Sequence, residues 1–537
     1  MAVDVLLFTG ISAYSYEVTN MSTSPSYEMA MRTSGTYRVA TYLRETYDLN
    51  VEVVDYLHSW TYEELVEIVD SRVDRNTKLV GVGGIFYLNT PNIASIFQYV
   101  KENYDVVTVA GSQGLWSIAS IPNIDYAIVG YGELGISAVL AGNPIYSEKS
   151  VYPGGPTVKV VECMDTKEYN AFPWKNIGIG YEKRDFVRPE ETLSFETSRG
   201  CRFQCAYCNF PILGVKDDHT RSAEDFERDL KRNYDTWGTT DYIVTDDTFN
   251  DYTDKITKYA DVVQDLSFEV DFTGYIRADL MTQRKGDLEQ LARMRFNSHL
   301  YGIESTNRES AKAMGKGGDP KKILDGILEA KEYMLKQTGY YRGEMSFIWG
   351  LPYETRETLD WTFDWIDKNW QGEAMSMFDL SIPMAGPHAI IRSNILSTNL
   401  DKYNYRKAQP IEISNIDVQL QQILDDPNVD DFNKNRMRLM KPDPNDPLYQ
   451  IHTVLWKNEH WDMISAWLGC QTELYGNKRY WDRGIPIFNQ ANWTSVGYKK
   501  TDLLKSFREL GLTMHPPIEK RRAVIEEYKQ NKLSWVS

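Results

Sequence analysis

The sequence predicts an α/β protein made of a doubly wound N-terminal domain, a partial barrel of six βα units and a small, mostly helical C-terminal domain. Short β-rich runs alternate with helical patterns over residues 1–140 and again over residues 189–400, which is typical of parallel sheets covered by helices. The alternation ends near residue 400. A chain of 537 residues also exceeds what a single hydrophobic core usually supports.

In residues 1–140, strand patterns are separated by segments with apolar residues three or four positions apart. The expected strands are Asp4–Phe8, Val51–Asp55, Lys78–Gly84, Asp105–Ala110 and Asp125–Val129. The expected helices are Gly35–Tyr47, Glu63–Val73 and Asn92–Asn103. This order predicts a Rossmann-like sheet, in which ligands bind outside the carboxyl ends of the strands.

Residues 141–188 are rich in Pro, Gly and isolated aromatic residues without a clear period, so we expect a linker there. Six further strand patterns follow in residues 189–400: Leu193–Thr197, Tyr242–Thr245, Glu269–Ile276, His299–Glu304, Met345–Trp349 and Met377–Ile382. Helical patterns separate them at Ala223–Tyr234, Asp254–Val263, Asp287–Met294, Lys321–Leu335 and Arg356–Trp365. Together they predict a partial, TIM-like (β/α)6 barrel whose strand carboxyl ends meet at one mouth.

Residues 401–537 are expected to form the mostly helical domain. The segment 425–447 is rich in Asp, Asn and Pro and is expected to be an exposed connection, whereas 451–468 and 517–529 have helical patterns. Three tryptophans of this part are expected to pack in a core, with the lining of a substrate cleft as the alternative: Trp456, Trp461 and Trp467.

The composition favours a small-molecule or peptide substrate. A net charge of −17 opposes binding to nucleic-acid phosphates and to an anionic membrane surface. Asp4 interrupts the first apolar run and no basic segment precedes it, and the longest apolar runs are far shorter than a bilayer span. We therefore expect a cytoplasmic protein that binds neither nucleic acid nor membrane.

Three of the five cysteines, Cys201, Cys205 and Cys208, lie within eight residues, while Cys163 and Cys470 stand alone. In a reducing compartment such clustering favours a metal or cluster over disulfides. Three thiolates on one loop suit a 4Fe-4S cluster whose fourth iron is open to an external ligand. The alternatives are a zinc site, which usually needs a fourth protein ligand, and a chance grouping of cysteines.

The spacing C-x-x-x-C-x-x-C after a strand, with the aromatic Tyr207 before the last cysteine, resembles the radical SAM superfamily. The resemblance implies an enzyme in which the open iron binds S-adenosyl-L-methionine, SAM. An electron from a low-potential donor such as flavodoxin or ferredoxin then cleaves SAM to a 5′-deoxyadenosyl radical. Tyr207 is expected beside the cofactors.

Polar residues at later strand ends extend the resemblance. Asp246 and Asp247 resemble the family's Asp-Asp segment and are expected near the methionine amine, although Asp247 also suits a helix N-cap. Arg277 is a candidate for the SAM carboxylate, with a surface ion pair as the alternative. Glu304, in Gly302-Ile-Glu-Ser305, is expected to accept from ribose hydroxyls or the amine.

The segment Gly350-Leu351-Pro-Tyr353-Glu-Thr355 resembles the family's G-L-P-G-E-T segment, which packs along adenine, so Gly350 and Leu351 are expected there. Tyr353 stands where the family has Gly. Because Tyr tolerates a positive φ poorly, this departure leaves the turn geometry open.

A doubly wound domain ahead of this core resembles the cobalamin-binding class of the superfamily. The segment 81–84 resembles its G-G pattern, and 125–133 resembles its D-x-x-x-x-G-E-G-E pattern with Tyr131 in place of Glu. The glycines expected near cobalamin are Gly83, Gly84, Gly130 and Gly132. The D-x-H-x-x-G pattern of histidine-on cobalamin proteins is absent, because His58 follows Asp55 without the glycine. The alternative is a degenerate domain kept for packing or for another ligand.

The resemblance therefore implies a radical SAM enzyme, with cobalamin-dependent methyl transfer to an unactivated carbon as the leading reaction. Radical cyclisation, rearrangement or dehydrogenation without cobalamin is the first alternative, and a non-catalytic iron–sulfur sensor is the second. Methylthio transfer is disfavoured because that family carries three more cysteines near the N-terminus and this chain does not.

Overall fold

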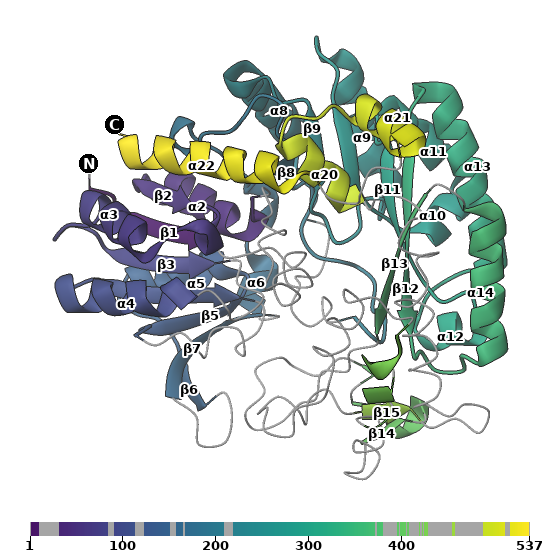
Figure 1. Cartoon of the computed structure of the whole chain (residues 1–537), viewed down its shortest axis with the longest axis horizontal. Coiled ribbons are helices and arrows are strands. Elements are labelled where there is room, and N and C mark those ends of the chain that lie inside the picture. The colour runs from purple at the N-terminus through teal and green to yellow at the C-terminus, as the bar shows by residue number, and fades with distance from the viewer. Residues whose placement is uncertain are drawn as a thin grey trace.

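The computed structural model describes residues 2–9, 32–83, 91–112, 123–150, 157–164, 167–208, 219–370, 373–379, 487–510 and 516–535, with short stretches between 395 and 456. Two α/β units lie side by side, and the C-terminal helices run along one edge of both (Figure 1). Within these described ranges no helix is both long and apolar enough to cross a membrane.

The first sheet has the strand order β2-β1-β3-β4-β5-β7-β6, and all neighbours are parallel except β6 and β7. Its first five strands are β1 (Val5–Thr9), β2 (Val51–Val54), β3 (Leu79–Gly83), β4 (Val107–Ser112) and β5 (Tyr126–Gly130). The helices of this unit are α2 (Ser34–Tyr47), α3 (Tyr62–Arg72), α4 (Pro91–Asn103) and α5 (Gly132–Leu140), with the 3-10 turn η1 (Leu57–Ser59). The predicted doubly wound sheet is confirmed.

The segment expected as a linker, residues 141–188, instead extends this sheet. Strands β6 (Ser147–Ser150) and β7 (Thr157–Cys163) continue it beyond β5. The antiparallel edge strand β6 is polar, Ser-Glu-Lys-Ser, so it carries no hydrophobic signal that a sequence pattern shows. Only the remainder is irregular, with the short helices α6 (Lys167–Ala171), η3 (Trp174–Asn176) and η4 (Lys183–Asp185).

The second unit is the predicted partial barrel, a parallel sheet of order β13-β12-β11-β10-β9-β8. Its strands are β8 (Leu193–Phe195), β9 (Asp241–Val244), β10 (Asp271–Ile276), β11 (Ser298–Glu304), β12 (Arg342–Trp349) and β13 (Ala374–Asp379). Its helices are α8 (Ala223–Trp237), α9 (Thr253–Asp265), α10 (Ala278–Gln283), α11 (Lys285–Arg293), α12 (Arg308–Ala313), α13 (Pro320–Thr338) and α14 (Arg356–Asn369). The last strand begins three residues before the predicted 377–382, because Ala374 already pairs with Glu344 of β12.

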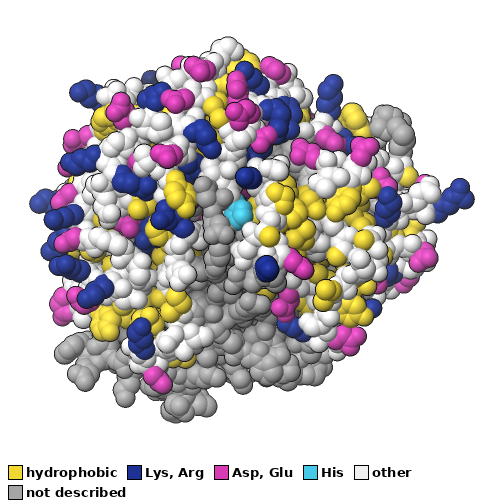
Figure 2. Space-filling model, turned by 180° about the vertical axis from the view of Figure 1, so that it is seen from behind, with side chains coloured by type: hydrophobic (Ala, Val, Ile, Leu, Met, Phe, Trp, Pro, Cys, Tyr) yellow, Lys and Arg dark blue, Asp and Glu magenta, His cyan; other side chains and the backbone are white. Residues whose placement is uncertain are grey.

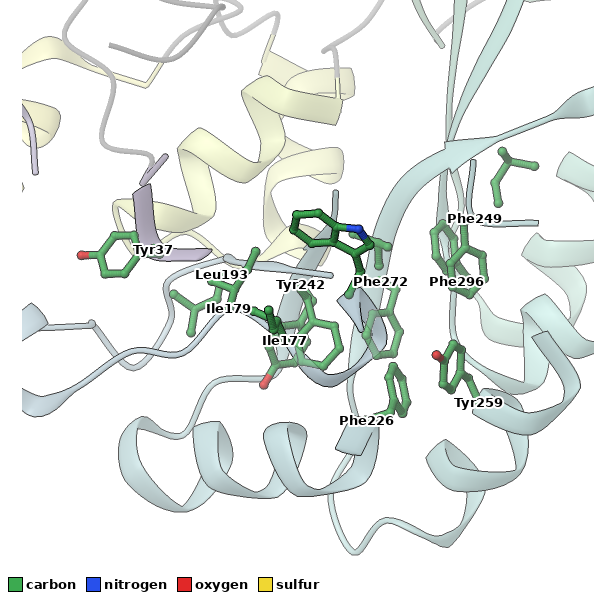
Figure 3. Packing of buried hydrophobic residues seen from close by; sticks show 14 of the residues in the cluster. Tyr37, Ile177, Ile179, Leu193, Phe226, Tyr242, Phe249, Tyr259, Phe272 and Phe296 are labelled. Carbon is green, nitrogen blue, oxygen red and sulfur yellow. The ribbon is translucent and has the colours of Figure 1, made fainter. Parts of the chain in front are cut away.

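Aromatic side chains fill the space between the outer face of this sheet and its helices (Figure 3). Phe226 of α8 stacks on Tyr259 of α9 with ring centroids 4.2 Å apart, and both are fully buried. Tyr242 of β9 and Phe272 of β10 stack beneath them, 5.6 Å apart. The burial of such large rings contributes several kcal/mol each, so the barrel strands are rigid supports for the loops at their ends.

The C-terminal part is mostly helical, as predicted, but it divides between the two units. Helices α20 (Ile487–Ser495) and α21 (Lys500–Leu510) pack on the barrel, where the Ile487 amide donates to Glu344. Helix α22 (Ile518–Ser534) crosses to the first unit (Figure 1), and the Tyr528 hydroxyl there accepts from the Asp55 amide at 2.9 Å. The C-terminus therefore holds the two α/β units together.

Residues 401–456 contribute the 3-10 turn η5 (Asp401–Tyr403) and the antiparallel strands β14 (Tyr405–Lys407) and β15 (Val454–Trp456). Trp456 thus lies in a strand, and the helix predicted over 451–468 is wrong at this point. Trp461, Trp467, Cys470 and the predicted connection 428–447 lie outside the described residues. On the rear face, side chains of both charge signs are interspersed over the described part (Figure 2).

Candidate active site

The three clustered cysteines lie on the loop that follows β8, at the carboxyl end of the barrel sheet. Cys205 is buried, Cys201 and Cys208 are partly buried, and none of them forms a disulfide. Backbone hydrogen bonds fix this loop: the Ala206 amide donates to the Met314 carbonyl at 3.0 Å, and the Cys208 amide donates to the Cys205 carbonyl at 3.1 Å. These bonds order the backbone of the loop that carries the three thiols, although among the described residues no three His, Cys, Asp or Glu side chains already lie as ligands of one metal ion.

Asp246, at the end of β9, binds the start of this loop. One carboxylate oxygen accepts from the amides of Thr197 and Ser198 at 2.8 and 3.0 Å, and the other accepts from their hydroxyls at 2.5 and 2.7 Å. The Lys255 ammonium lies 3.4 Å from the second oxygen. Because these partners occupy both oxygens, Asp246 orients the cysteine loop rather than presenting a vacant carboxylate.

Asp247 has a different environment. Its Oδ2 atom is buried and has no hydrogen-bond partner among the described residues. Burial raises the pKa of this carboxyl to about 7; the guanidinium of Arg38 opposes the shift, and the charges of Asp246 and Glu196 add to it. The sequence-based alternative of a helix cap is not observed, because helix α9 starts at Thr253.

Arg277 follows β10 and is buried, so the expected surface alternative does not describe it. Its Nη1 lies 3.6 Å from the Cys205 sulfur, and its guanidinium lies 3.8 Å above the ring of Phe203. It also pairs with Asp279 at 2.8 Å.

Tyr207 and Glu304 meet at the barrel mouth. The Tyr207 hydroxyl donates to Glu304 Oε1 at 2.8 Å, and Lys316 pairs with the same oxygen at 3.1 Å. Glu304 ends β11 with φ of 64°, a left-handed conformation that is strained in a non-glycine residue. A Cβ at Gly302 would lie 2.6 Å from Glu304 Oε1, so this glycine makes room for the carboxylate.

The Gly350–Thr355 turn lies next to this pair. Leu351 is fully buried and packs in one cluster with Ala206 of the cysteine loop. Tyr353 has φ of 66°, so it adopts the left-handed conformation that glycine favours, with its ring half exposed. Glu354 accepts from the Ser305 hydroxyl at 2.7 Å and from the Leu351 amide at 3.2 Å, and burial raises its pKa to about 8. The turn is formed despite the substitution of Tyr for Gly.

The predicted glycines of the first unit lie at the carboxyl ends of β3 and β5. A Cβ at Gly83 would meet the Thr36 hydroxyl at 2.6 Å, and Gly130 has φ of 102° with the Cys163 carbonyl directly beside it. Gly132 begins α5, and Gly84 lies outside the described residues. Gly83 and Gly130 are both partly exposed at the edge of the sheet where ligands of such folds bind.

A buried set of charged residues, which we call the seam network, joins the two units. It consists of Arg38 on α2, Glu133 on α5, and Glu196 and Arg199 between β8 and Cys201. Arg199 pairs with Glu133 at 2.6 Å and with Glu196 at 2.9 Å, and Arg38 pairs with Glu196 at 3.1 Å.

Sequence reasoning did not identify the residues of the seam network as site residues. Glu133 lay inside the quoted glycine pattern, and Arg199 stands two positions before Cys201. The arginine two positions before the first clustered cysteine is a signal that the sequence contains. Its pairing across two domains is visible only in the fold.

Comparison with known proteins decides the family of the second unit. Residues 195–366 match the radical SAM superfamily. These residues are a radical SAM domain. The protein is accordingly an enzyme, and its radical SAM domain implies a 4Fe-4S cluster and SAM as cofactors. The loop of Cys201, Cys205 and Cys208 fits that cluster, because it offers three thiols near the buried cation of Arg277.

Two relatives are similar in sequence. An uncharacterized methyltransferase of Pyrococcus horikoshii is 23% identical over 68% of this chain and 80% of its own length. A protein of Methanocaldococcus jannaschii named as a methylthiotransferase is 26% identical over 50% of this chain and 58% of its own length.

Two solved structures share the fold over nearly the whole chain. The radical SAM methyltransferase TsrM from Kitasatospora setae, solved with cobalamin and a [4Fe-4S] cluster, has a TM-score of 0.59 at 14% identity and covers 99% of both chains. The cobalamin-dependent radical SAM enzyme OxsB has a TM-score of 0.55 at 12% identity, over 99% of this chain and 80% of its own.

Proposed function

We propose that this protein is a cobalamin-dependent radical SAM methyltransferase that adds a methyl group to an unactivated carbon of a small-molecule or peptide substrate. The observation that carries the proposal is the contact between the two units. Glu133, in the first turn of α5 just after Gly130 and Gly132, pairs with Arg199 of the cysteine loop. A ligand bound at the first sheet's carboxyl ends and one bound at the barrel mouth would therefore face each other.

At the barrel mouth, we assign one set of residues to the iron–sulfur cluster and another set to SAM. Cys201, Cys205 and Cys208 would bind three irons of the cluster, and Arg277, 3.6 Å from the Cys205 sulfur, would offset the negative charge of the thiolates. Tyr207, Glu304 and Lys316 form a polar patch that suits the amine and hydroxyls of SAM. A bound cluster supplies the electron that cleaves SAM, and an external low-potential protein such as flavodoxin or ferredoxin would deliver it.

Asp247 and the Gly350–Leu351 turn complete the proposed SAM site. The partnerless Asp247 oxygen is able to accept one hydrogen bond from an amine. Leu351 packs against Ala206 of the cysteine loop, and we expect the Gly350–Leu351 backbone to contact the adenine ring of SAM. Asp246 stays a positioning residue for the cysteine loop.

The strand ends of the N-terminal unit support the proposal that this unit binds cobalamin. Gly83 and Gly130 are partly exposed at the ends of β3 and β5, and the hydroxyls of Thr33 and Thr36 at the start of α2 are buried without partners among the described residues. Unpaired buried hydroxyls cost free energy, and a polar ligand at this edge would supply the missing hydrogen bonds. Both similar solved structures are named as radical SAM enzymes with cobalamin.

The test is anaerobic reconstitution with iron and sulfide, followed by addition of hydroxocobalamin, SAM and a strong reductant. We expect stoichiometric cobalamin to remain bound through gel filtration, and 5′-deoxyadenosine and S-adenosylhomocysteine to form. A Cys205→Ala variant is expected to retain cobalamin but form no 5′-deoxyadenosine. Formation of 5′-deoxyadenosine without cobalamin retention would favour radical cyclisation, rearrangement or dehydrogenation instead. An assembled cluster that never cleaves SAM would favour a sensing protein.

A further inference from the structure

The seam network places three charged side chains in the interior, with the partly buried Arg38 beside them, and stability alone does not explain this arrangement. Glu133, Glu196 and Arg199 are each at most 3% exposed. Removing such charges from water costs several kcal/mol per ion, and well-packed apolar residues of similar volume are often equally or more stabilising. What an ion pair adds over apolar packing is a fixed geometry, since a guanidinium accepts carboxylates only in certain directions.

Arg199 is the centre of this geometry. Its Nε and Nη2 bind Glu196 at 3.1 and 2.9 Å in a fork, while its Nη1 binds Glu133 at 2.6 Å. Its guanidinium also lies over two aromatic rings, 4.4 Å from Trp174 and 5.0 Å from Tyr131. A single guanidinium makes all of these contacts, so Arg199 cannot move far without breaking several of them.

Carboxylates and guanidiniums alternate in this network. Burial alone would raise the pKa of Glu196, but the guanidiniums of Arg199 and Arg38 hold it below its usual value. Arg38 approaches both carboxylates, at 3.1 Å from Glu196 and 3.9 Å from Glu133. Two carboxylates and two guanidiniums therefore pair, with the carboxyl of Asp247 close enough to interact with Arg38 and Glu196 as well, and the network links elements of both units.

We propose that Arg199 is a positioning residue that sets the location of the cysteine loop, and hence of its cluster, relative to the N-terminal domain. Only Gly200, with φ of 86°, separates Arg199 from Cys201. A displacement of Arg199 therefore shifts the first cysteine directly. The value of this alignment for methyl transfer between two bound cofactors rests on the proposed function, whereas the alignment itself does not.

The experiment measures the distance between the cluster and the N-terminal domain. A nitroxide is attached at Glu102→Cys, an exposed position of α4, in reconstituted full-length protein. After reduction, pulsed electron paramagnetic resonance records the distance distribution between the nitroxide and the reduced cluster. This readout uses neither cobalamin nor substrate, so it stays informative even when cobalamin fails to bind.

We expect one narrow distribution in the parent protein and a broadened, shifted one in Arg199→Met and Glu133→Gln. Arg199→Lys keeps one charged contact and is expected to be intermediate. The matched control is Arg342→Met, which removes an equally buried arginine paired with Glu373 at 2.7 Å but distant from the N-terminal domain. This control should keep the parent distribution.

Unchanged distributions in Arg199→Met and Glu133→Gln, with the cluster fully assembled, would overturn the proposal. Equal broadening in Arg342→Met would also overturn it, because the effect would then reflect general loosening. If Arg199→Met does not assemble its cluster, Glu133→Gln decides, since Glu133 lies far from the cysteines in sequence and leaves their loop intact.

Discussion

Replacing Asp246 by Ala should loosen the cysteine loop while leaving the barrel folded. The substitution removes the acceptor of the Thr197 and Ser198 amides and of their hydroxyls. Lys255 keeps a partner, because Asp251 lies 2.7 Å from its ammonium. A hydrogen bond to a charged group contributes about 1.5–3 kcal/mol, so the two amide bonds alone give roughly 3 kcal/mol.

Hydrogen exchange measured by mass spectrometry on a peptide spanning 193–208 tests this magnitude. A loss of roughly 3 kcal/mol corresponds to about a hundredfold faster exchange of the two amides, since 1.4 kcal/mol is tenfold. Parent and variant are compared without iron, so that metal ligation does not mask the effect. Asp254→Asn, an exposed acidic residue nearby on α9, is the control and should exchange like the parent. Equal exchange in Asp246→Ala and Asp254→Asn would refute the role given to Asp246.

Three further predictions concern other contacts. Tyr353→Gly should raise the thermal midpoint by about 2 °C, because glycine removes left-handed strain of roughly 1 kcal/mol; Tyr353→Ala, which keeps the strain, should not. Glu354 binds its proton more tightly when folded, so the parent should lose stability as pH rises from 4.5 to about 8, by up to about 1.4 kcal/mol per unit. Thermal melts of Glu354→Gln should lack that decline, and a parallel decline would contradict the assignment. Tyr528→Phe leaves the Asp55 amide unpaired at a cost of about 1–3 kcal/mol, so exchange over 51–57 should quicken; unchanged exchange would show that α22 is not held there.

The strands and helices of both α/β units were predictable because buried strands and amphipathic helices impose periods that the chain displays. Leu79–Gly83 is apolar throughout and pairs with strands on both sides. Strand β6 was not predictable, because an edge strand with exposed side chains needs no apolar residues. Likewise, the place where α22 packs depends on long-range contacts such as Tyr528 with Asp55, which no local pattern encodes.

In the candidate site, too, some residues were predictable from the sequence and others were not. The three cysteines, Glu304 and Gly350 stood out as residue types at strand ends, and the fold brings them to one mouth. The use of Asp246 was not predictable, because a carboxylate that binds backbone amides and one that binds a ligand look identical in sequence. In the neighbouring Asp247, the Oδ2 atom has no hydrogen-bond partner among the described residues. The different hydrogen-bond partners of the two carboxylates, which only the structure shows, distinguish the residue that positions the loop from the residue that is able to bind a ligand.

Tyr131 stands where the cobalamin-binding class has Glu. This difference bears on whether the N-terminal domain is kept only for packing. A glutamate there, as the resembled pattern has, would place a third carboxylate beside Glu133 and Glu196, against the two guanidiniums of Arg38 and Arg199. The tyrosine instead offers its ring face to both guanidiniums, 5.5 and 5.0 Å away, an attraction that needs no added charge. A domain kept for packing alone gains nothing from a set of buried charges that cost desolvation. The tyrosine at position 131 adds no further carboxylate to this set, so it favours an N-terminal domain whose position relative to the cysteine loop is part of how the enzyme works.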